Sequence, residues 1–346
     1  MARKKRIVLS MDGGGIRGLI PLRLLESIES RMSHRGVRRP LHQCFDLMCG
    51  TSTGGLIAAA IAAPKPGSGI DEAAFSISDL RAFFERDTRE IFIRSIGRTL
   101  SLRLTNPLGL FNENYDPRPL ETWLKEHFGW TSLASALTPV VLTTYDIERR
   151  QAVFLTNGHA HDGAKADDFY IWQAVRAALA TPGYLEPARV DNLSTGDTNT
   201  LIDAGIFLQN PVFSAYIEAR KMGWEAEDIV ILSLGSGHAA QKGFSFQEAS
   251  NWGSHDWVRP SNGSPLLSIA SDAQSRTASY QADCLFTDLG EARLIRIDGE
   301  IPAESEAIDN ARPGNLIKLN GAADRIIRDN TILLDEVAEL LITAAA

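Results

Sequence analysis

The chain has 346 residues, of which 44% are hydrophobic and 23% are charged, a composition that is ordinary for a soluble globular protein able to bury a substantial core. Its formal net charge of −8 argues against binding of a nucleic-acid polymer and against a broadly cationic membrane-binding surface. No apolar run approaches the ~18 residues of a membrane-spanning helix, and the apolar run near the start is shorter than the ~7–15 residues of a signal peptide.

The first predicted element is an apolar strand at residues 7–11, followed directly by a glycine-rich turn at residues 12–18. A helix with apolar residues at helical spacing begins within this turn and extends to residue 32. A turn at a helix N-terminus presents backbone N–H groups that can stabilise a developing oxyanion. The residues to which we assign this role are Gly13, Gly14 and Gly15. Arg17 is expected to brace the turn, and contact with a substrate phosphate is the alternative.

The same turn has a second interpretation. Gly13, Gly15 and Gly18 satisfy the Gly-x-Gly-x-x-Gly pattern of dinucleotide-binding proteins. That pattern requires an acidic residue at the end of the second strand, where it binds the ribose. Asp46 lies near the start of that strand instead, and the strand ends in a serine-containing turn. The sequence therefore argues against a dinucleotide site.

The second predicted strand, at residues 45–49, ends in the turn Gly50-Thr51-Ser52-Thr53-Gly54-Gly55 and is followed by an apolar, alanine-rich helix. The turn fits Gly-x-Ser-x-Gly, the nucleophile elbow, in which a strained strand-to-helix turn presents a serine hydroxyl. Gly50 and Gly54 leave the clearance that such a sharp turn needs. About 0.1 chance matches are expected in a chain of this length. The strand before and the helix after the turn favour Ser52 as a nucleophile.

Helices and strands alternate along the rest of the chain. Further helices are predicted at residues 77–92, 120–127, 172–180 and 212–222, the first capped by Ser78 or Asp79. Further strands are predicted at residues 140–145, 152–155, 200–202, 229–232 and 294–297. Near-continuous apolar strands between helices are typical of a buried, mostly parallel sheet in an α/β protein.

Residues 94–115 form a long, partly apolar segment without a helical or strand period. A mobile lid is one interpretation of such a segment, and a packed surface loop is the other. Cys44, Cys49 and Cys284 lack metal-ligand spacing and lie in apolar sequence surroundings. We expect buried free thiols in a reducing, cytoplasmic compartment and no bound metal.

Ser52 needs a base, because a serine hydroxyl is a weak nucleophile until its proton is accepted. His238 and His255 lie late enough in the chain to serve in the usual α/β-hydrolase order. Asp203 is the alternative base, since it ends a short apolar strand beside a turn of small residues. A surface histidine and a turn-forming aspartate are the corresponding structural interpretations, and the local residues do not decide among them.

With these motifs, the chain resembles the patatin-like phospholipases. The family's Asp-Gly-Gly-Gly-x-Arg-Gly element matches residues 12–18, and its Gly-x-Ser-x-Gly matches residues 50–54. Its Asp-Gly-Gly/Ala element, which carries the catalytic aspartate, corresponds to residues 203–205. The alanine-rich block at residues 174–187 and Ser-Leu-Gly-Ser-Gly at residues 233–237 are also similar to family blocks. Five blocks in the right order cover about two thirds of the chain.

The resemblance implies a three-layer α/β/α patatin-like fold with a mostly parallel central sheet and a helical C-terminal portion. Residues 1–260 would form the catalytic core, and residues 261–346 a mainly helical portion packed on the same domain. Two positions depart from the family pattern. Ala204 replaces the commoner glycine, and Gln209 replaces the first asparagine of Asn-Asn-Pro. Neither departure touches the nucleophile, its base or the oxyanion turn.

The resemblance also implies a Ser–Asp dyad without histidine. Ser52 would attack an acyl ester, Asp203 would accept its proton and later activate water, and Gly205 would support the aspartate turn. No cofactor is implied. The substrate would be a phospholipid or another acyl-ester lipid, reached by transient contact with a membrane surface from the cytoplasm.

Two further interpretations stay open. Bacterial members of the family include immune effectors of antiphage defence that are switched on by cyclic nucleotides, so a cyclic-nucleotide activator is an alternative partner. A catalytically silent module could keep the glycine turns to bind a nucleotide or another anion. The intact Ser52 and Asp203 weigh against such a module. The sequence does not decide between a monomer and a homo-oligomer.

Overall fold

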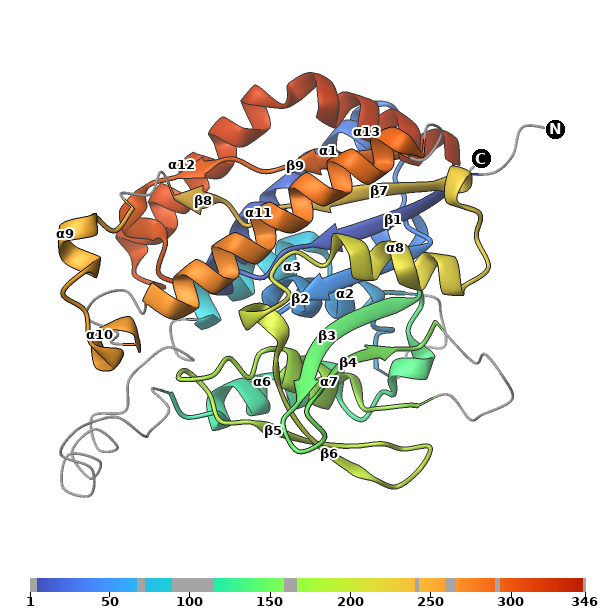
Figure 1. The fold of residues 1–346 in the computed structure, drawn as a ribbon. Coiled ribbons are helices and arrows are strands. Elements are labelled where there is room, and N and C mark those ends of the chain that lie inside the picture. The colour runs from blue at the N-terminus through green and yellow to red at the C-terminus, as the bar shows by residue number, and fades with distance from the viewer. Residues whose placement is uncertain are drawn as a thin grey trace.

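A sheet with strand order β5-β6-β3-β2-β1-β7-β9 organises the molecule, and β4 pairs with the other side of β3 (Figure 1). The computed structural model describes residues 5–66, 72–88, 115–158, 167–239, 243–258, 265–289 and 293–344. The strands are β1 Arg6–Met11, β2 Leu47–Thr51, β3 Val140–Asp146, β4 Gln151–Thr156, β5 Ala188–Asp191, β6 Thr198–Asp203, β7 Ile229–Leu234 and β9 Arg293–Ile297. Neighbours from β9 through β3 are parallel, whereas β4, β6 and β5 are joined by antiparallel pairing. The predicted mostly parallel sheet is confirmed.

The central strands are apolar throughout because both faces of the sheet are covered. In β1, Ile7 and Leu9 belong to the core on one face, and Val8 between them belongs to the core on the other. Strand β7 divides in the same way, with Val230 on the first face and Ile231 on the second. Side chains of a strand alternate between the two faces of the sheet. A continuous apolar run therefore contributes side chains to the cores on both faces.

Helices form a layer on each side of this sheet (Figure 1). One layer contains α1 Leu19–His34, α2 Thr53–Ala62, α3 Ile77–Ala82, α6 Arg118–Phe128, α7 Ile171–Ala178, α12 Pro313–Asp329 and α13 Thr331–Ala344. The other layer contains α8 Val212–Lys221 and α11 Pro265–Asp288. The predicted three-layer α/β/α architecture is confirmed. No described helix is both long enough and apolar enough to cross a membrane.

The C-terminal portion contributes to the sheet as well as to a helical layer. Strand β9 pairs with β7, and α12 and α13 pack on α1. Ion pairs between Arg23 and Asp324 at 2.7 Å and between Arg31 and Asp335 at 2.9 Å join these helices. Four shorter elements lie near the ends of β7 and β9: β8 His238–Ala239, α9 Phe246–Ala249, α10 Ser254–Val258 and β10 Glu300–Ile301. The boundary near residue 260 stays a prediction.

Local details differ from the sequence predictions in three places. The helix at α3 is capped by Ser76 rather than by Ser78 or Asp79, because Ser76 and Asp79 form a reciprocal capping box. The helix continues from Phe83 to Asp87 with π-helical geometry. Cys284 is exposed rather than buried, while Cys44 and Cys49 are buried as predicted.

One prediction concerns residues that lie almost entirely outside the described part of the chain. The predicted lid at residues 94–115 falls outside it except for its last residue.

Strand β5 was absent from the sequence prediction, since its four residues alternate between buried and exposed and carry no turn signal of their own.

Candidate active site

Ser52 occupies a strained turn between β2 and α2. Its φ of 54° and ψ of −124° place a non-glycine residue in the left-handed half of the Ramachandran plot, which costs about 1–3 kcal/mol. The two flanking glycines explain how the turn closes. A Cβ on Gly50 would lie 2.2 Å from the carbonyl carbon of Gly54, and a Cβ on Gly54 would lie 2.4 Å from the carbonyl oxygen of Met11. Both glycines therefore act as predicted for an elbow of this kind.

Sheet register brings Asp203 to this turn. Thr51 at the end of β2 pairs with Thr143 of β3, and the next residue of β3, Thr144, pairs with Asp203 at the end of β6. The Asp203 carboxylate is buried, and the nearby Ser52 hydroxyl is one of the groups that lower its pKa. Two residues 151 positions apart in the chain are thus placed in one site.

Two further donors fix the orientation of the carboxylate. The Thr181 hydroxyl donates to one oxygen of Asp203 at 2.7 Å, and the Gly205 N–H donates to the other at 2.8 Å. Burial raises the pKa of Asp203, because it disfavours the charged form, while the hydrogen bonds from Thr181, Gly205 and Ser52 oppose this rise. The site therefore contains an oriented carboxylate of increased basicity beside the serine.

The glycine turn contacts the same site, and the N–H groups of its three consecutive glycines differ in their partners. The Gly13 N–H donates to the Gln209 carbonyl oxygen at 3.0 Å, so it is engaged within the protein. In the part of the chain that the structure describes, no acceptor is found for the N–H groups of Gly14 and Gly15. Of the three glycines to which the sequence analysis assigned the oxyanion role, Gly14 and Gly15 thus have N–H groups available to a ligand in this structure.

The orientation of these two N–H groups is set through the preceding carbonyl groups. The Gly13 carbonyl oxygen accepts a hydrogen bond from the Ser236 hydroxyl at 2.6 Å and another from the Gln209 side chain. The Gly14 carbonyl oxygen accepts from the Arg17 backbone N–H at 3.1 Å. Since C=O and N–H point in opposite directions across a trans peptide, holding each carbonyl directs the next N–H to the other side.

Close contacts require glycine at both positions. A Cβ on Gly14 would lie 2.5 Å from the Ser236 hydroxyl oxygen. Gly15 has a φ of +57°, and a Cβ there would lie 2.2 Å from the Ile308 carbonyl oxygen. The constraint on Gly14 is thus its contact with Ser236, and the left-handed backbone belongs to Gly15.

Arg17 braces the turn, as the sequence analysis expected. Its Nη1 donates to the Gly237 carbonyl oxygen at 3.1 Å, and its Nε donates to the Gly14 carbonyl oxygen at 3.3 Å. These contacts use the guanidinium to join the glycine turn to the loop after β7. Arg17 is therefore a support of the turn.

A buried ion pair anchors the start of the turn, and sequence reasoning missed it. Arg296 of β9 donates two hydrogen bonds to the Asp12 carboxylate, at 2.8 and 2.6 Å, and also contacts Asp298 at 3.0 Å. Burial alone would lower the pKa of Arg296, but the two carboxylates outweigh this effect and raise it. The pair spans 284 residues, and the pairing of β1 with β7 and of β7 with β9 brings its members together.

The two candidate histidines lie elsewhere. His238 is half-exposed, and its Nδ1 lies 3.7 Å from Asp298, whose carboxylate raises the pKa of the imidazole. His255 is exposed on α10. Neither histidine lines the cavity that contains Ser52. Among the residues considered, Asp203 is the one that the structure brings to Ser52.

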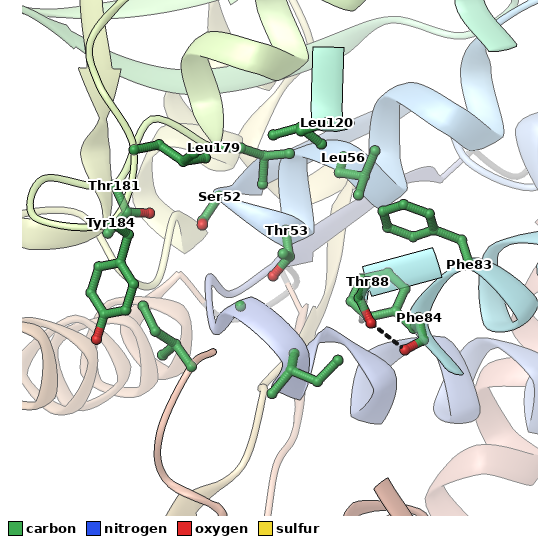
Figure 2. A pocket seen from close by; sticks show the side chains of 14 residues that line it. Ser52, Thr53, Leu56, Phe83, Phe84, Thr88, Leu120, Leu179, Thr181 and Tyr184 are labelled. Atoms are coloured by element: carbon green, nitrogen blue, oxygen red, sulfur yellow. Dashed lines mark hydrogen bonds between the residues drawn. The ribbon is translucent and has the colours of Figure 1, made fainter. Parts of the chain in front are cut away.

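The cavity at Ser52 is mostly apolar (Figure 2). It encloses about 580 Å³ of empty space, open solvent included. Its labelled apolar side chains are Leu56, Phe83, Phe84, Leu120 and Leu179. The Thr88 hydroxyl donates to the Phe84 carbonyl oxygen at 2.7 Å, so this wall presents little free polarity. No cluster of metal-binding side chains occurs among the described residues. The cavity suits an aliphatic chain next to a serine hydroxyl.

Comparison with known proteins shows the family to which the chain belongs. The sequence model of the patatin-like phospholipases matches residues 9–216, and the chain belongs to this family of lipid acyl hydrolases. Patatin-like protein 2 of Arabidopsis thaliana is 30% identical over 347 residues, which cover 93% of this chain and 82% of that protein. Patatin-like protein 1 of Oryza sativa subsp. indica is 29% identical over 348 residues, covering 92% and 80%. The crystal structure of VipD from Legionella pneumophila gives a TM-score of 0.38 at 12% identity, covering 94% of this chain and 67% of that one.

The Asp12–Arg296 pair predicts a large effect on stability. Removal of one partner leaves a buried charge without compensation, so Arg296→Ala should lower the free energy of unfolding by about 3–5 kcal/mol in urea denaturation followed by circular dichroism. Arg276→Ala is the matched control, because Arg276 is 62% exposed in its pair with Asp272 and such pairs contribute less than ~1 kcal/mol. Similar small effects for the two variants would contradict an anchoring role for Arg296.

Proposed function

We propose that the protein hydrolyses acyl ester bonds of membrane phospholipids through a Ser52–Asp203 dyad and an acyl-enzyme intermediate. The observation that carries the proposal is the buried Asp203 carboxylate, which the sheet register places beside Ser52 and which Thr181 and Gly205 orient. Family membership supports the lipid substrate, and the apolar cavity beside Ser52 supports an acyl chain as the group that is bound.

The first half of the reaction forms the acyl-enzyme. The Ser52 oxygen attacks the ester carbonyl carbon while its proton passes to Asp203. The carbonyl oxygen becomes an oxyanion and accepts hydrogen bonds from the N–H groups of Gly14 and Gly15. The tetrahedral intermediate then collapses, the bond to the alcohol oxygen breaks, and the alcohol leaves with the proton from Asp203.

The second half releases the fatty acid. Asp203 accepts a proton from water, whose oxygen attacks the acyl carbon, and the oxyanion again binds at Gly14 and Gly15. Collapse returns the proton from Asp203 to the Ser52 oxygen. The increased basicity that burial gives to Asp203 suits both proton transfers, because an ordinary aspartate is a weak base toward a hydroxyl.

The sequence leaves two alternatives open, a catalytically silent binding module and activation by a cyclic nucleotide. The intact Ser52 and Asp203 geometry argues against a catalytically silent binding module. Control by a cyclic nucleotide remains an addition to the proposed activity, and a panel of such nucleotides in the esterase assay tests it. The enzyme would act from the cytoplasm at a membrane surface. The proposal holds for a monomer and for a homo-oligomer.

The dyad predicts a ranking of three variants on a soluble ester. Ser52→Ala and Asp203→Asn should each lower kcat by at least ~10³-fold, because each removes an essential member of one unit. His238→Ala should lower kcat by less than about tenfold, since His238 pairs with Asp298 away from Ser52. Circular dichroism spectra of the three variants serve as the control for folding. A loss for His238→Ala as large as that for Ser52→Ala would replace the dyad by a triad.

The acid limb of the pH–rate profile provides a separate prediction. Asp203 must be ionised to accept a proton, and burial raises its pKa above the ordinary value of 3.8. A smaller fraction of the base is therefore ionised as the pH falls, so kcat/KM should begin to decline at a higher pH than an ordinary aspartate would give. The limb should be retained in His238→Ala. A midpoint at or below 3.8, or a limb that disappears in His238→Ala, would contradict the assignment.

A further inference from the structure

Five apolar side chains lie on and around α9 and α10, and we call this group the aromatic face. Its members are Phe244, Phe246, Trp257 and Val258, which are exposed, and Trp252, which is partly buried. Phe246 is 82% exposed and Val258 is 52% exposed, so these side chains do not fill the core. Leu266 and Ile269, on the first turns of α11, are also exposed, and α10 packs against that helix. Exposed apolar side chains gathered on neighbouring elements mark interaction sites.

Three rings of the aromatic face are fixed relative to one another. Trp252 lies between Phe244 and Trp257 in two edge-to-face contacts, each with 4.9 Å between ring centroids. Glu248 is used in a capping box with Ser245, which begins α9. The two short helices thus hold a prearranged set of rings, which reduces the entropy lost when a partner binds.

The composition of the segment selects the kind of partner. Residues 243–258 contain the acidic residues Glu248 and Asp256, and the basic residues Lys242 and Arg259 stand directly before and after them. These charges balance and give no net attraction to an anionic surface, whereas tryptophan and phenylalanine favour the boundary between lipid headgroups and acyl chains. We propose that the aromatic face inserts into the surface of a zwitterionic phospholipid bilayer.

The aromatic face is connected to the candidate active site through α11. The Ser271 hydroxyl of this helix donates to the Gly205 carbonyl oxygen at 3.1 Å, next to Asp203. The Ser275 hydroxyl donates to the Asp12 carboxylate at 3.5 Å, at the start of the glycine turn. In Figure 1, α9 and α10 project from the edge of the molecule toward which β1 and β7 run. Docking there brings lipid to the edge that carries Ser52, so this inference rests on the proposed lipid hydrolysis.

The test measures vesicle binding separately from hydrolysis. The full chain carrying Ser52→Ala is sedimented with phosphatidylcholine vesicles, with and without the pair Phe246→Ser and Trp257→Ser. Two exposed apolar side chains are lost from the bilayer contact, so binding should weaken by at least about tenfold. Tyr280→Ser is the matched control, because Tyr280 is 70% exposed on the same α11 but roughly 20 Å beyond its first residues. The control should bind as the parent does.

Activity assays with Ser52 intact separate the two proposals. The Phe246→Ser and Trp257→Ser pair should hydrolyse vesicle lipid at least about tenfold more slowly and a soluble ester within about twofold of the parent rate. Circular dichroism confirms that the pair is folded. If the parent hydrolyses neither substrate while vesicle binding still depends on the pair, the aromatic face is supported and the proposed function fails.

Three results would overturn the aromatic face as a bilayer contact. The first is unchanged vesicle binding by the pair while the parent hydrolyses the soluble ester. The second is binding that requires anionic lipid and is lost as salt rises from ~0.05 to ~0.5 M, which would indicate a charge-driven contact elsewhere. The third is a change of oligomeric state without a change of vesicle binding. If light scattering shows that the parent is an oligomer and that the double variant Phe246→Ser and Trp257→Ser is not, the surface binds a second copy of the chain.

Discussion

The close approach of two glycine-containing turns is the constraint on which the site depends. Parallel pairing aligns Met11 at the end of β1 with Gly50 at the end of β2, so the two turns leave the sheet at the same level. Gly54 then passes under the Met11 carbonyl at a distance that no Cβ could occupy. The strained Ser52 and the glycine turn are therefore positioned by one backbone contact, and any side chain at Gly54 would separate them.

Polar groups buried around this contact hold the glycine turn in one orientation. Arg296 anchors its first residue, Ser236 and Gln209 hold the Gly13 carbonyl, and Arg17 joins the turn to the loop after β7. A buried polar group that loses its partner lowers the stability of the folded state. The network therefore favours a single arrangement of the turn. Because Arg296 lies on β9, the C-terminal portion supports the same site as the N-terminal strands.

Local sequence predicted the parts of the site that depend on neighbours in the chain. The elbow at Ser52 and the turn at Gly14 and Gly15 could be recognised because a strand, small residues and a helix follow one another within a few positions. The choice between Asp203 and the histidines could not be made locally, because it depends on the antiparallel pairing of β6 with β3. Engagement of the Gly13 N–H by Gln209 and the pairing of Arg296 with Asp12 depend in the same way on contacts distant in sequence.

The most direct test of the central claim is to locate the covalent adduct formed with an organophosphonate that mimics an acyl ester. Peptide mass spectrometry should find one phosphonyl group per chain, on Ser52, and its rate of formation should fall by at least ~10²-fold in Asp203→Asn and remain nearly unchanged in His238→Ala. An adduct on another residue, or labelling of Ser52 at an equal rate without Asp203, would contradict the Ser52–Asp203 dyad.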